Sequence, residues 1–275
     1  MNTIKKIYRK INKIILINFI KFIDPVFQKL GVFLLPKFGE LKKYSLTYAN
    51  QTRRYLINKE NKSFNKLFID TSLSDTELCF LGKKHPTNKS PLNDKGHRSG
   101  FTGIYTLLFS NLRNKRINIA EIGIEKNNST KIWRKYFQYS NIYAFEYDKK
   151  KIIKAKKDKL KRTYYVQTDV TKKESIKKSF GKAKCKFDII IDDSTHIFND
   201  QINIIEETYK FLKKDGILII EDIYRYVKDY DELNYYKKLN HLEKEFNDIF
   251  FIESINFNNF NASWKNEKLL IFIKK

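Results

Sequence analysis

Residues 186–223 read KFDIIIDDSTHIFNDQINIIEETYKFLKKDGILIIEDI, and their pattern predicts the centre of the fold. A largely apolar, β-branched run at 187–191 predicts a short buried strand. Apolar side chains then recur at helical spacing from 197 to 212, and an Asp-Gly pair marks the end of that helix. A second apolar run follows at 217–220. The segment therefore predicts a strand, a helix and a second strand.

Both predicted strands end on a pair of acids, Asp192 with Asp193 and Glu221 with Asp222, and His196 follows the first pair. The carboxyl ends of neighbouring parallel strands face one crevice, so these side chains are expected to share a site. Carboxylates this close repel one another unless a cation or a shared proton offsets their charge. We therefore predict a hard divalent metal held by Asp193, Glu221 and Asp222. The alternative is that these acids are polar strand ends exposed to water.

The alternation of strands and helices extends on both sides of this segment. Strands are predicted at 117–122, 141–145, 164–166, 187–191, 217–220, 249–255 and 269–273, and helices at 101–112, around 132–137, and at 149–161, 172–180, 197–212 and 229–246. This order is typical of an α/β fold with a doubly wound, mostly parallel sheet. The last two strands predict a terminal hairpin that adds an antiparallel strand at the sheet edge.

The end of the first predicted strand suggests a nucleotide-like cofactor. Glu121 and Gly123 lie at this strand end, where a turn precedes a helix and offers unpaired backbone N–H groups. Glu146 ends the second strand, where an acid can accept hydrogen bonds from ribose hydroxyls. The first turn reads GIEKNN and lacks the glycines of a pyrophosphate-binding loop. A cofactor with ribose and adenine but no phosphate suits this turn better.

The motifs, taken in order, resemble those of a known enzyme family. EIG ends the first strand, an acid ends the second, TD follows the third, IDDSTH the fourth and IIED the fifth. This order resembles the class I S-adenosylmethionine-dependent methyltransferases. The DKG segment at 94–96, the FTGIYTLLF helix and the DDxxH turn more narrowly resemble the metal-dependent sugar O-methyltransferases, such as those acting on macrolide deoxysugars. The resemblance covers residues 92–275.

The resemblance implies a Rossmann-like, seven-stranded sheet and a sugar or glycan hydroxyl as the methyl acceptor. It implies that residues at the strand ends bind S-adenosylmethionine: Glu121, Gly123, Glu146, Asp169 and Asp192. It also implies magnesium at Asp193, Glu221 and Asp222, with Asp193 and His196 as the catalytic pair. His196 would be the general base that removes the proton of the attacking hydroxyl.

Residues 1–91 are predicted to form a helical N-terminal extension to the domain at 92–275. Within it, residues 1–23 combine an Ile and Phe stripe with a lysine-rich opposite face, which predicts a basic amphipathic helix. Such a helix can lie in an anionic membrane surface, or it can dock on its own domain or on a partner subunit. Both interpretations remain open at this point, and so does the question whether the protein forms a homo-oligomer.

The composition sets broad limits on partners and compartment. The 55 Lys and Arg against 31 acids give a formal charge of +24, which favours anionic partners, but a general bias of composition explains it equally well. Cys79 and Cys185 show neither disulfide nor zinc spacing, which fits a reducing cytoplasm. No apolar run reaches the roughly 20 residues of a membrane span. We therefore expect a cytoplasmic protein, with peripheral binding to the inner membrane face as an option through residues 1–23.

Two other functions compete with sugar O-methylation. An RNA methyltransferase would share the donor, but the fourth strand lacks an NPPY-like motif and the basic residues are spread over the chain, so nucleic acid is disfavoured. A non-catalytic, membrane-associated protein of a polysaccharide pathway would keep the fold without turnover. Donor binding separates both enzymes from the third candidate.

Overall fold

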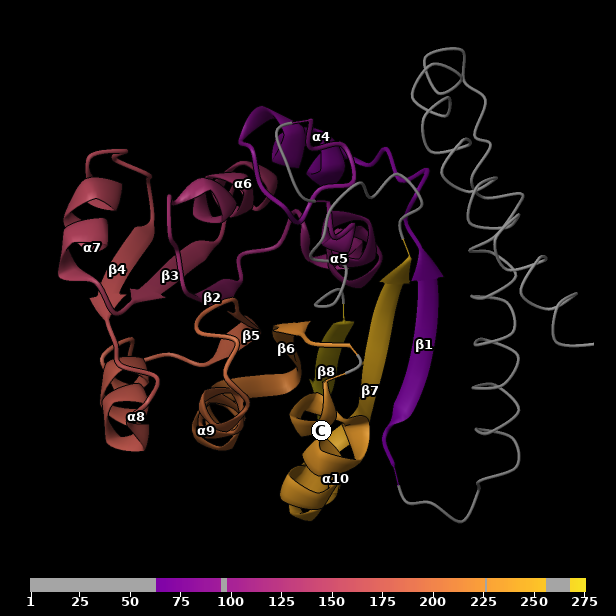
Figure 1. Ribbon diagram of the computed structural model, residues 1–275. Coiled ribbons are helices and arrows are strands. Elements are labelled where there is room, and N and C mark those ends of the chain that lie inside the picture. The colour runs from indigo at the N-terminus through magenta and orange to yellow at the C-terminus, as the bar shows by residue number, and fades with distance from the viewer. Residues whose placement is uncertain (1–62, 95–97, 226, 256–267) are drawn as a thin grey trace, which may run out of the picture. The chain divides into compact units, whose positions relative to one another are not determined.

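The computed structural model of the protein describes residues 63–94, 98–225, 227–255 and 268–275 (Figure 1). The chain divides into two units between Lys62 and Ser63, and the described residues belong to the second. The predicted amphipathic helix at 1–23 lies outside the described residues. The sequence placed the start of the domain at 92, whereas residues from Ser63 onward are grouped with the sheet.

One eight-stranded sheet forms the centre of the fold, in the order β1-β7-β8-β6-β5-β2-β3-β4. β8 runs antiparallel to both of its neighbours, β6 and β7, and the other pairings are parallel. The predicted α/β fold with a mostly parallel sheet is confirmed. The strands are β1 (Asn65–Asp70), β2 (Asn118–Ile122), β3 (Asn141–Glu146), β4 (Thr163–Gln167), β5 (Phe187–Asp192), β6 (Leu212–Ile223), β7 (Phe246–Ile255) and β8 (Lys268–Lys274).

Helices cover both faces of the sheet, which gives three layers. α4, α5 and α6 lie on one face, and α8, α9 and α10 lie on the other (Figure 1). The helices are α4 (Glu77–Lys84), α5 (Phe101–Phe109), α6 (Asn128–Tyr136), α7 (Lys149–Lys156), α8 (Lys173–Gly181), α9 (Phe198–Thr208) and α10 (Glu232–Leu239), with 3-10 turns η1 (Ser110–Leu112), η2 (Tyr209–Phe211), η3 (Lys228–Tyr230) and η4 (Asn240–Glu245). None of the helices in this part of the chain has the length and apolar character that crossing a membrane requires.

The apolar runs seen in the sequence form hydrophobic cores on both faces of the sheet. Ile189 and Ile191 of β5 pack with α5 and α6, while Ile190, between them, packs on the opposite face with α8 and α9. All three side chains are fully buried. A strand that is buried on both faces has little freedom to shift, so the residues that follow it are held in fixed positions.

The sheet has one strand more than the predicted seven. β1 lies at the edge beside β7, and β8 is inserted between β6 and β7. β1 was not predicted, because the burial of its side chains does not follow their polarity. Leu67 is 48% exposed, whereas the side chain of Lys66 is only 16% exposed because it forms ion pairs with Glu232 and Glu253.

Candidate functional site

A cavity of about 750 Å³ opens at the carboxyl ends of the central strands. The parallel register sets these ends side by side, with Ile122 of β2 opposite both Phe145 of β3 and Asp192 of β5. The loops that follow β2, β3, β4 and β5 contribute to the cavity wall, as does Asp222 near the end of β6. Pockets for small ligands usually have volumes of roughly 300 to 1,000 Å³.

Gly123 allows the loops after β2 and β5 to approach one another closely. Its φ of +87° is one that side chains rarely adopt. A Cβ atom at this position would lie 2.1 Å from the backbone oxygen of Asp193. The backbone N–H of Gly123 also donates to the carbonyl of Phe145, at 2.8 Å. A glycine is therefore required where the two loops meet at the cavity.

Glu146 lines the same cavity and is 7% exposed. Its Oε2 accepts a hydrogen bond from the backbone N–H of Ile124 at 3.2 Å, and its Oε1 accepts from that of Asp148 at 2.9 Å. The carboxylate thus joins the loops after β2 and β3. Each of its oxygens has a second lone pair, so Glu146 retains the capacity to accept from a ligand hydroxyl.

The other three predicted donor-binding residues are not among those that line the cavity. Glu121 is buried and accepts hydrogen bonds from Thr130 at 2.8 Å and Trp133 at 2.9 Å, both on α6; burial raises its pKa. Asp169 binds the hydroxyl of Thr171 at 2.6 Å, although its neighbours in the chain line the cavity. Asp192, whose pKa burial raises to about 7, accepts hydrogen bonds from Ser194.

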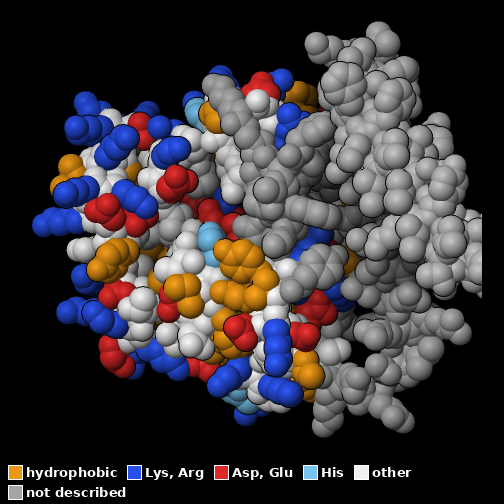
Figure 2. All heavy atoms as spheres, viewed as in Figure 1, with side chains coloured by type: hydrophobic (Ala, Val, Ile, Leu, Met, Phe, Trp, Pro, Cys, Tyr) orange, Lys and Arg blue, Asp and Glu red, His pale blue; other side chains and the backbone are white. Residues whose placement is uncertain are grey.

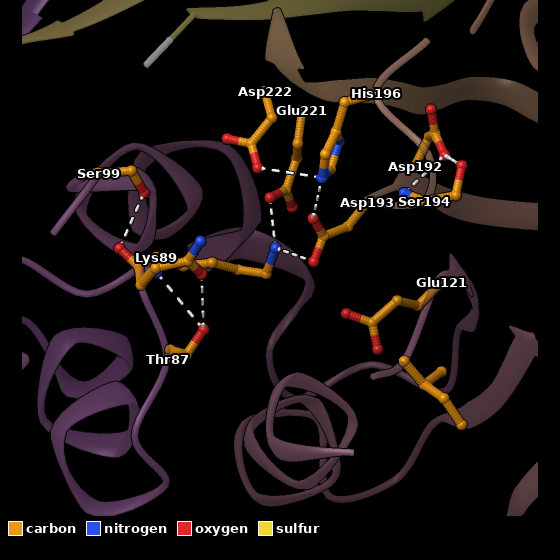
Figure 3. Close-up of polar contacts among 12 residues, drawn as sticks. Thr87, Lys89, Ser99, Glu121, Asp192, Asp193, Ser194, His196, Glu221 and Asp222 are labelled. Atoms are coloured by element: carbon orange, nitrogen blue, oxygen red, sulfur yellow. Dashed lines mark hydrogen bonds and ion pairs between the residues drawn. The ribbon is translucent and has the colours of Figure 1, made fainter. Parts of the chain in front are cut away.

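Carboxylates from β6 and from the loop after β5 lie close together, and two of them line the cavity (Figure 3). We call Asp193, Glu221 and Asp222 the acid cluster. Lys89 points into it, with its Nζ 2.6 Å from Oδ2 of Asp193 and in a hydrogen bond with Oε2 of Glu221. The hydroxyl of Tyr105, on α5, donates to Oε1 of Glu221 at 2.6 Å. Both oxygens of Glu221 are therefore already bound to other side chains.

His196 faces the acid cluster from the loop that precedes α9. Its Nε2 lies 3.5 Å from Oδ2 of Asp222 and 3.9 Å from Oδ1 of Asp193. Nδ1 of His196 and Oδ1 of Asp222 are buried, and neither has a hydrogen-bond partner within the described ranges. Asp193, His196 and Asp222 each present a ligand atom within 4.8 Å of the others, an arrangement that can hold a metal ion.

Two solved structures of MycE methyltransferase from the mycinamycin biosynthetic pathway are similar to this one. The complex with Mg, SAH and mycinamycin VI has a TM-score of 0.54 and 18% identity, covering 73% of this chain and 55% of MycE. A crystal form with Mg and SAH gives 0.54 and 18%, covering 72% and 55%. The chain has the class I methyltransferase fold. It spans just over half the length of MycE, and its sequence matches no family model and no curated protein.

Within this methyltransferase fold, sequence reasoning missed Lys89 and Tyr105. Lys89 lies in the segment TNKS, between α4 and α5 and ahead of the predicted start of the domain. Tyr105 was placed on the correct helix, but its apolar neighbours indicated only a packing role. The spacing of residues along the chain contains no signal that either side chain reaches Glu221, since both contacts span more than a hundred residues.

The charges of the acid cluster shift one another's pKa values. Burial lowers the pKa of the Lys89 ammonium group, but the attraction of Asp193 and Glu221 outweighs burial, so its pKa lies above the ordinary value. Lys89 is therefore charged at neutral pH. Burial raises the pKa of Asp222 to about 7, and the neighbouring Asp193 adds to the rise. A further cation beside Asp193 and Asp222 would therefore favour their ionised forms.

Proposed function

We propose that the protein transfers a methyl group from S-adenosylmethionine to a hydroxyl group of a sugar or glycan, with a divalent metal ion at the acid cluster. One observation carries the proposal. Gly123 and Glu146, which suit a nucleoside donor, line the same cavity as Asp193, His196 and Asp222, which suit a metal-bound hydroxyl. The MycE complex, in which Mg, SAH and a mycinamycin are bound to the same type of fold, supports this combination.

The donor end of the cavity offers groups for ribose. Glu146 has lone pairs available to accept from ribose hydroxyls, and its position at the end of β3 is the place where such an acid acts in doubly wound folds. The loop after β2 passes close to the donor position because Gly123 lets it lie against Asp193. The donor, when bound, supplies a methyl group whose bond to sulfur breaks as the bond to the acceptor oxygen forms.

The acceptor end of the cavity fits a hard cation. Asp193 and Asp222 would be its carboxylate ligands. Oδ1 of Asp222 has no partner among the described residues, and Nε2 of His196 lies near both Oδ1 of Asp193 and Oδ2 of Asp222. A bound divalent metal would lower the pKa of a coordinated hydroxyl group. His196 would be the proton acceptor, at Nε2, the ring nitrogen that faces the two acids.

The surface gives more support to a sugar than to a nucleic acid. On the face in Figure 2, the Lys and Arg side chains of the described residues are interspersed with acidic side chains. Nucleic-acid recognition usually gathers basic residues into a patch or stripe. A sugar needs no such patch, because its hydroxyl groups are recognised by hydrogen bonds and by the metal.

The proposal is tested with methyl-labelled donor and a panel of acceptors. Purified protein is incubated with the donor and with neutral glycans, glycosides or RNA, each with and without a strong chelator. We expect label in a carbohydrate acceptor, lost on chelation and restored by added Mg²⁺. Transfer to RNA, or transfer to a carbohydrate that the chelator leaves unchanged, would contradict the proposal.

A further inference from the structure

Lys89 brings a cation of the chain's own into the acid cluster. The residue is only 2% exposed, and its ammonium group binds both Asp193 and Glu221 (Figure 3). A buried ammonium group is unfavourable unless it is paired and hydrogen-bonded. Asp193 and Glu221 therefore hold the ammonium group in place, and the ammonium group in turn holds their carboxylates in place.

The loop that carries Lys89 is fixed to the start of α5. The carbonyl of Lys89 accepts a hydrogen bond from the backbone N–H of Thr102 at 3.0 Å. The carbonyl of Asn88 accepts one from the N–H of Ser99 at 2.6 Å, and the hydroxyl of Ser99 donates to the same carbonyl. These bonds restrain the backbone on both sides of Lys89. The backbone from which the ammonium group extends is therefore held in place.

Lys89 divides the acid cluster into two parts. Glu221 is bound through Oε2 to Lys89 and through Oε1 to Tyr105, so a metal ion at Glu221 would lie against the ammonium group. Two cations this close repel one another strongly in a buried site. Asp193 is bound to Lys89 only through Oδ2, and its Oδ1 remains directed toward His196. Asp222 makes no ion pair with Lys89 within the described residues.

The charges are consistent with this division. With a divalent cation bound, three ionised carboxylates, one ammonium group and the cation would together carry no net charge. Lys89 thus offsets the charge of Glu221, while Asp193 and Asp222 are left for a metal ion.

We propose that Lys89 is a positioning residue that occupies Glu221, so that a divalent metal is held by Asp193 and Asp222 and Glu221 is not a ligand. This proposal rests on the proposed function, because it assigns the metal site of that reaction. It differs from the ligand set predicted from the sequence, which included Glu221. Removal of Lys89 should release Glu221 and Asp193 to the metal ion and so tighten metal binding.

The test is direct titration of Mn²⁺ into the full-length protein, followed by electron paramagnetic resonance, without donor or acceptor. Glu221→Gln should change the dissociation constant by less than about threefold, whereas Asp222→Asn should weaken binding by about thirtyfold or more. Lys89→Met should tighten binding by about tenfold, because a neighbouring positive charge is lost. The matched control is Lys84→Met, which removes an exposed lysine from the end of α4 and should leave binding unchanged.

The proposal is overturned if Glu221→Gln weakens Mn²⁺ binding as much as Asp222→Asn does, or if no variant binds the ion. It is also overturned if Lys89→Met folds and binds no more tightly than Lys84→Met. Should Lys89→Met fail to fold, the two conservative acid variants decide the question alone. Titration of SAH into the same samples keeps the two claims apart, because loss of SAH binding would count against the proposed function rather than against the role of Lys89.

Discussion

His196 and Asp222 share an uncommon backbone conformation. Their φ angles are +57° and +56°, in the left-handed region that residues other than glycine seldom occupy. Such conformations cost of order 1 kcal/mol or more and persist where the surrounding structure holds them. Here they turn both side chains toward Asp193. The backbone thus contributes directly to the geometry of the proposed metal site.

His196→Ala should lower the rate of methyl transfer by roughly 100-fold to 10,000-fold, the range for loss of a positioned general base. The loss should be smaller at high pH, where the acceptor hydroxyl ionises without help. The measurement is the pH–rate profile with metal saturating. His241→Ala, which removes an exposed histidine from η4, is the control and should match the wild type. An unchanged profile in His196→Ala would exclude the residue as the base.

Gly123→Ala should destabilise the protein and weaken donor binding. The new Cβ atom would lie 2.1 Å from the carbonyl oxygen of Asp193, and φ at this position is +87°, so the loops after β2 and β5 must separate. We expect a loss of about 1 to 3 kcal/mol in the free energy of unfolding, measured by urea titration. Gly181→Ala on α8 is the matched control.

At Gly181 a Cβ atom meets nothing within 4 Å, so Gly181→Ala should leave the stability unchanged or raise it slightly. If Gly123→Ala proves as stable as Gly181→Ala, the close approach of the two loops is not important.

At the scale of single elements, strands built from apolar runs could be predicted from the sequence. The strand that depends on ion pairs could not. β5 and β6 were predicted because their Ile and Leu side chains are buried in uninterrupted runs. β1 was not predicted, because Lys66 is held inside by Glu232 and Glu253 while Leu67 is half exposed. The site shows the same contrast. Acids at strand ends can be read from strand boundaries, but a lysine from a distant loop leaves no local pattern.

The ion pairs around β1 predict how stability depends on pH. Burial raises the pKa of Glu232, but Lys268 and Lys66 outweigh this effect and hold its pKa below the ordinary 4.5. A carboxyl group with a lowered pKa stabilises the fold above its unfolded pKa and loses that contribution as the pH falls through its folded pKa. Glu232→Gln should therefore lower the free energy of unfolding at pH 7 by about 1 to 2 kcal/mol.

Urea unfolding of Glu232→Gln and wild type at several pH values checks this. The difference between them should shrink as the pH is lowered below 4.5. Glu243→Gln on η4, an exposed position, is the control and should behave as the wild type at every pH. A difference that stays constant down to the acid range would show that Glu232 acts through packing rather than through its charge.

At the scale of the whole molecule, the described residues contain an eight-stranded sheet and line the cavity, and residues 1–62 form the other unit. The predicted amphipathic helix at 1–23 belongs to that other unit, so its role rests on sequence alone. The fold and the acid cluster followed from strand order. The role of the N-terminal residues did not, because an amphipathic stripe suits a membrane surface and a protein surface equally well.

Deletion of residues 1–23 should reduce sedimentation with vesicles that contain anionic lipid, if the lysine-rich face binds their headgroups. High salt should have the same effect on the intact protein, because screening weakens the attraction. Neutral vesicles are the control and should bind both forms weakly. Equal binding by the intact and shortened proteins would instead favour docking of this helix on protein.

The measurement that most directly tests the central claim is calorimetric titration of SAH into the full-length protein. We expect saturable binding at one site per chain. Glu146→Ala should weaken this binding by about 1 to 3 kcal/mol, because the variant loses acceptors for the ribose hydroxyls and a tie between the loops after β2 and β3. Asp229→Asn, on η3 outside the cavity wall, should bind as the wild type does. Absence of SAH binding to folded wild-type protein, or equal affinity in a folded Glu146→Ala variant, would contradict the account.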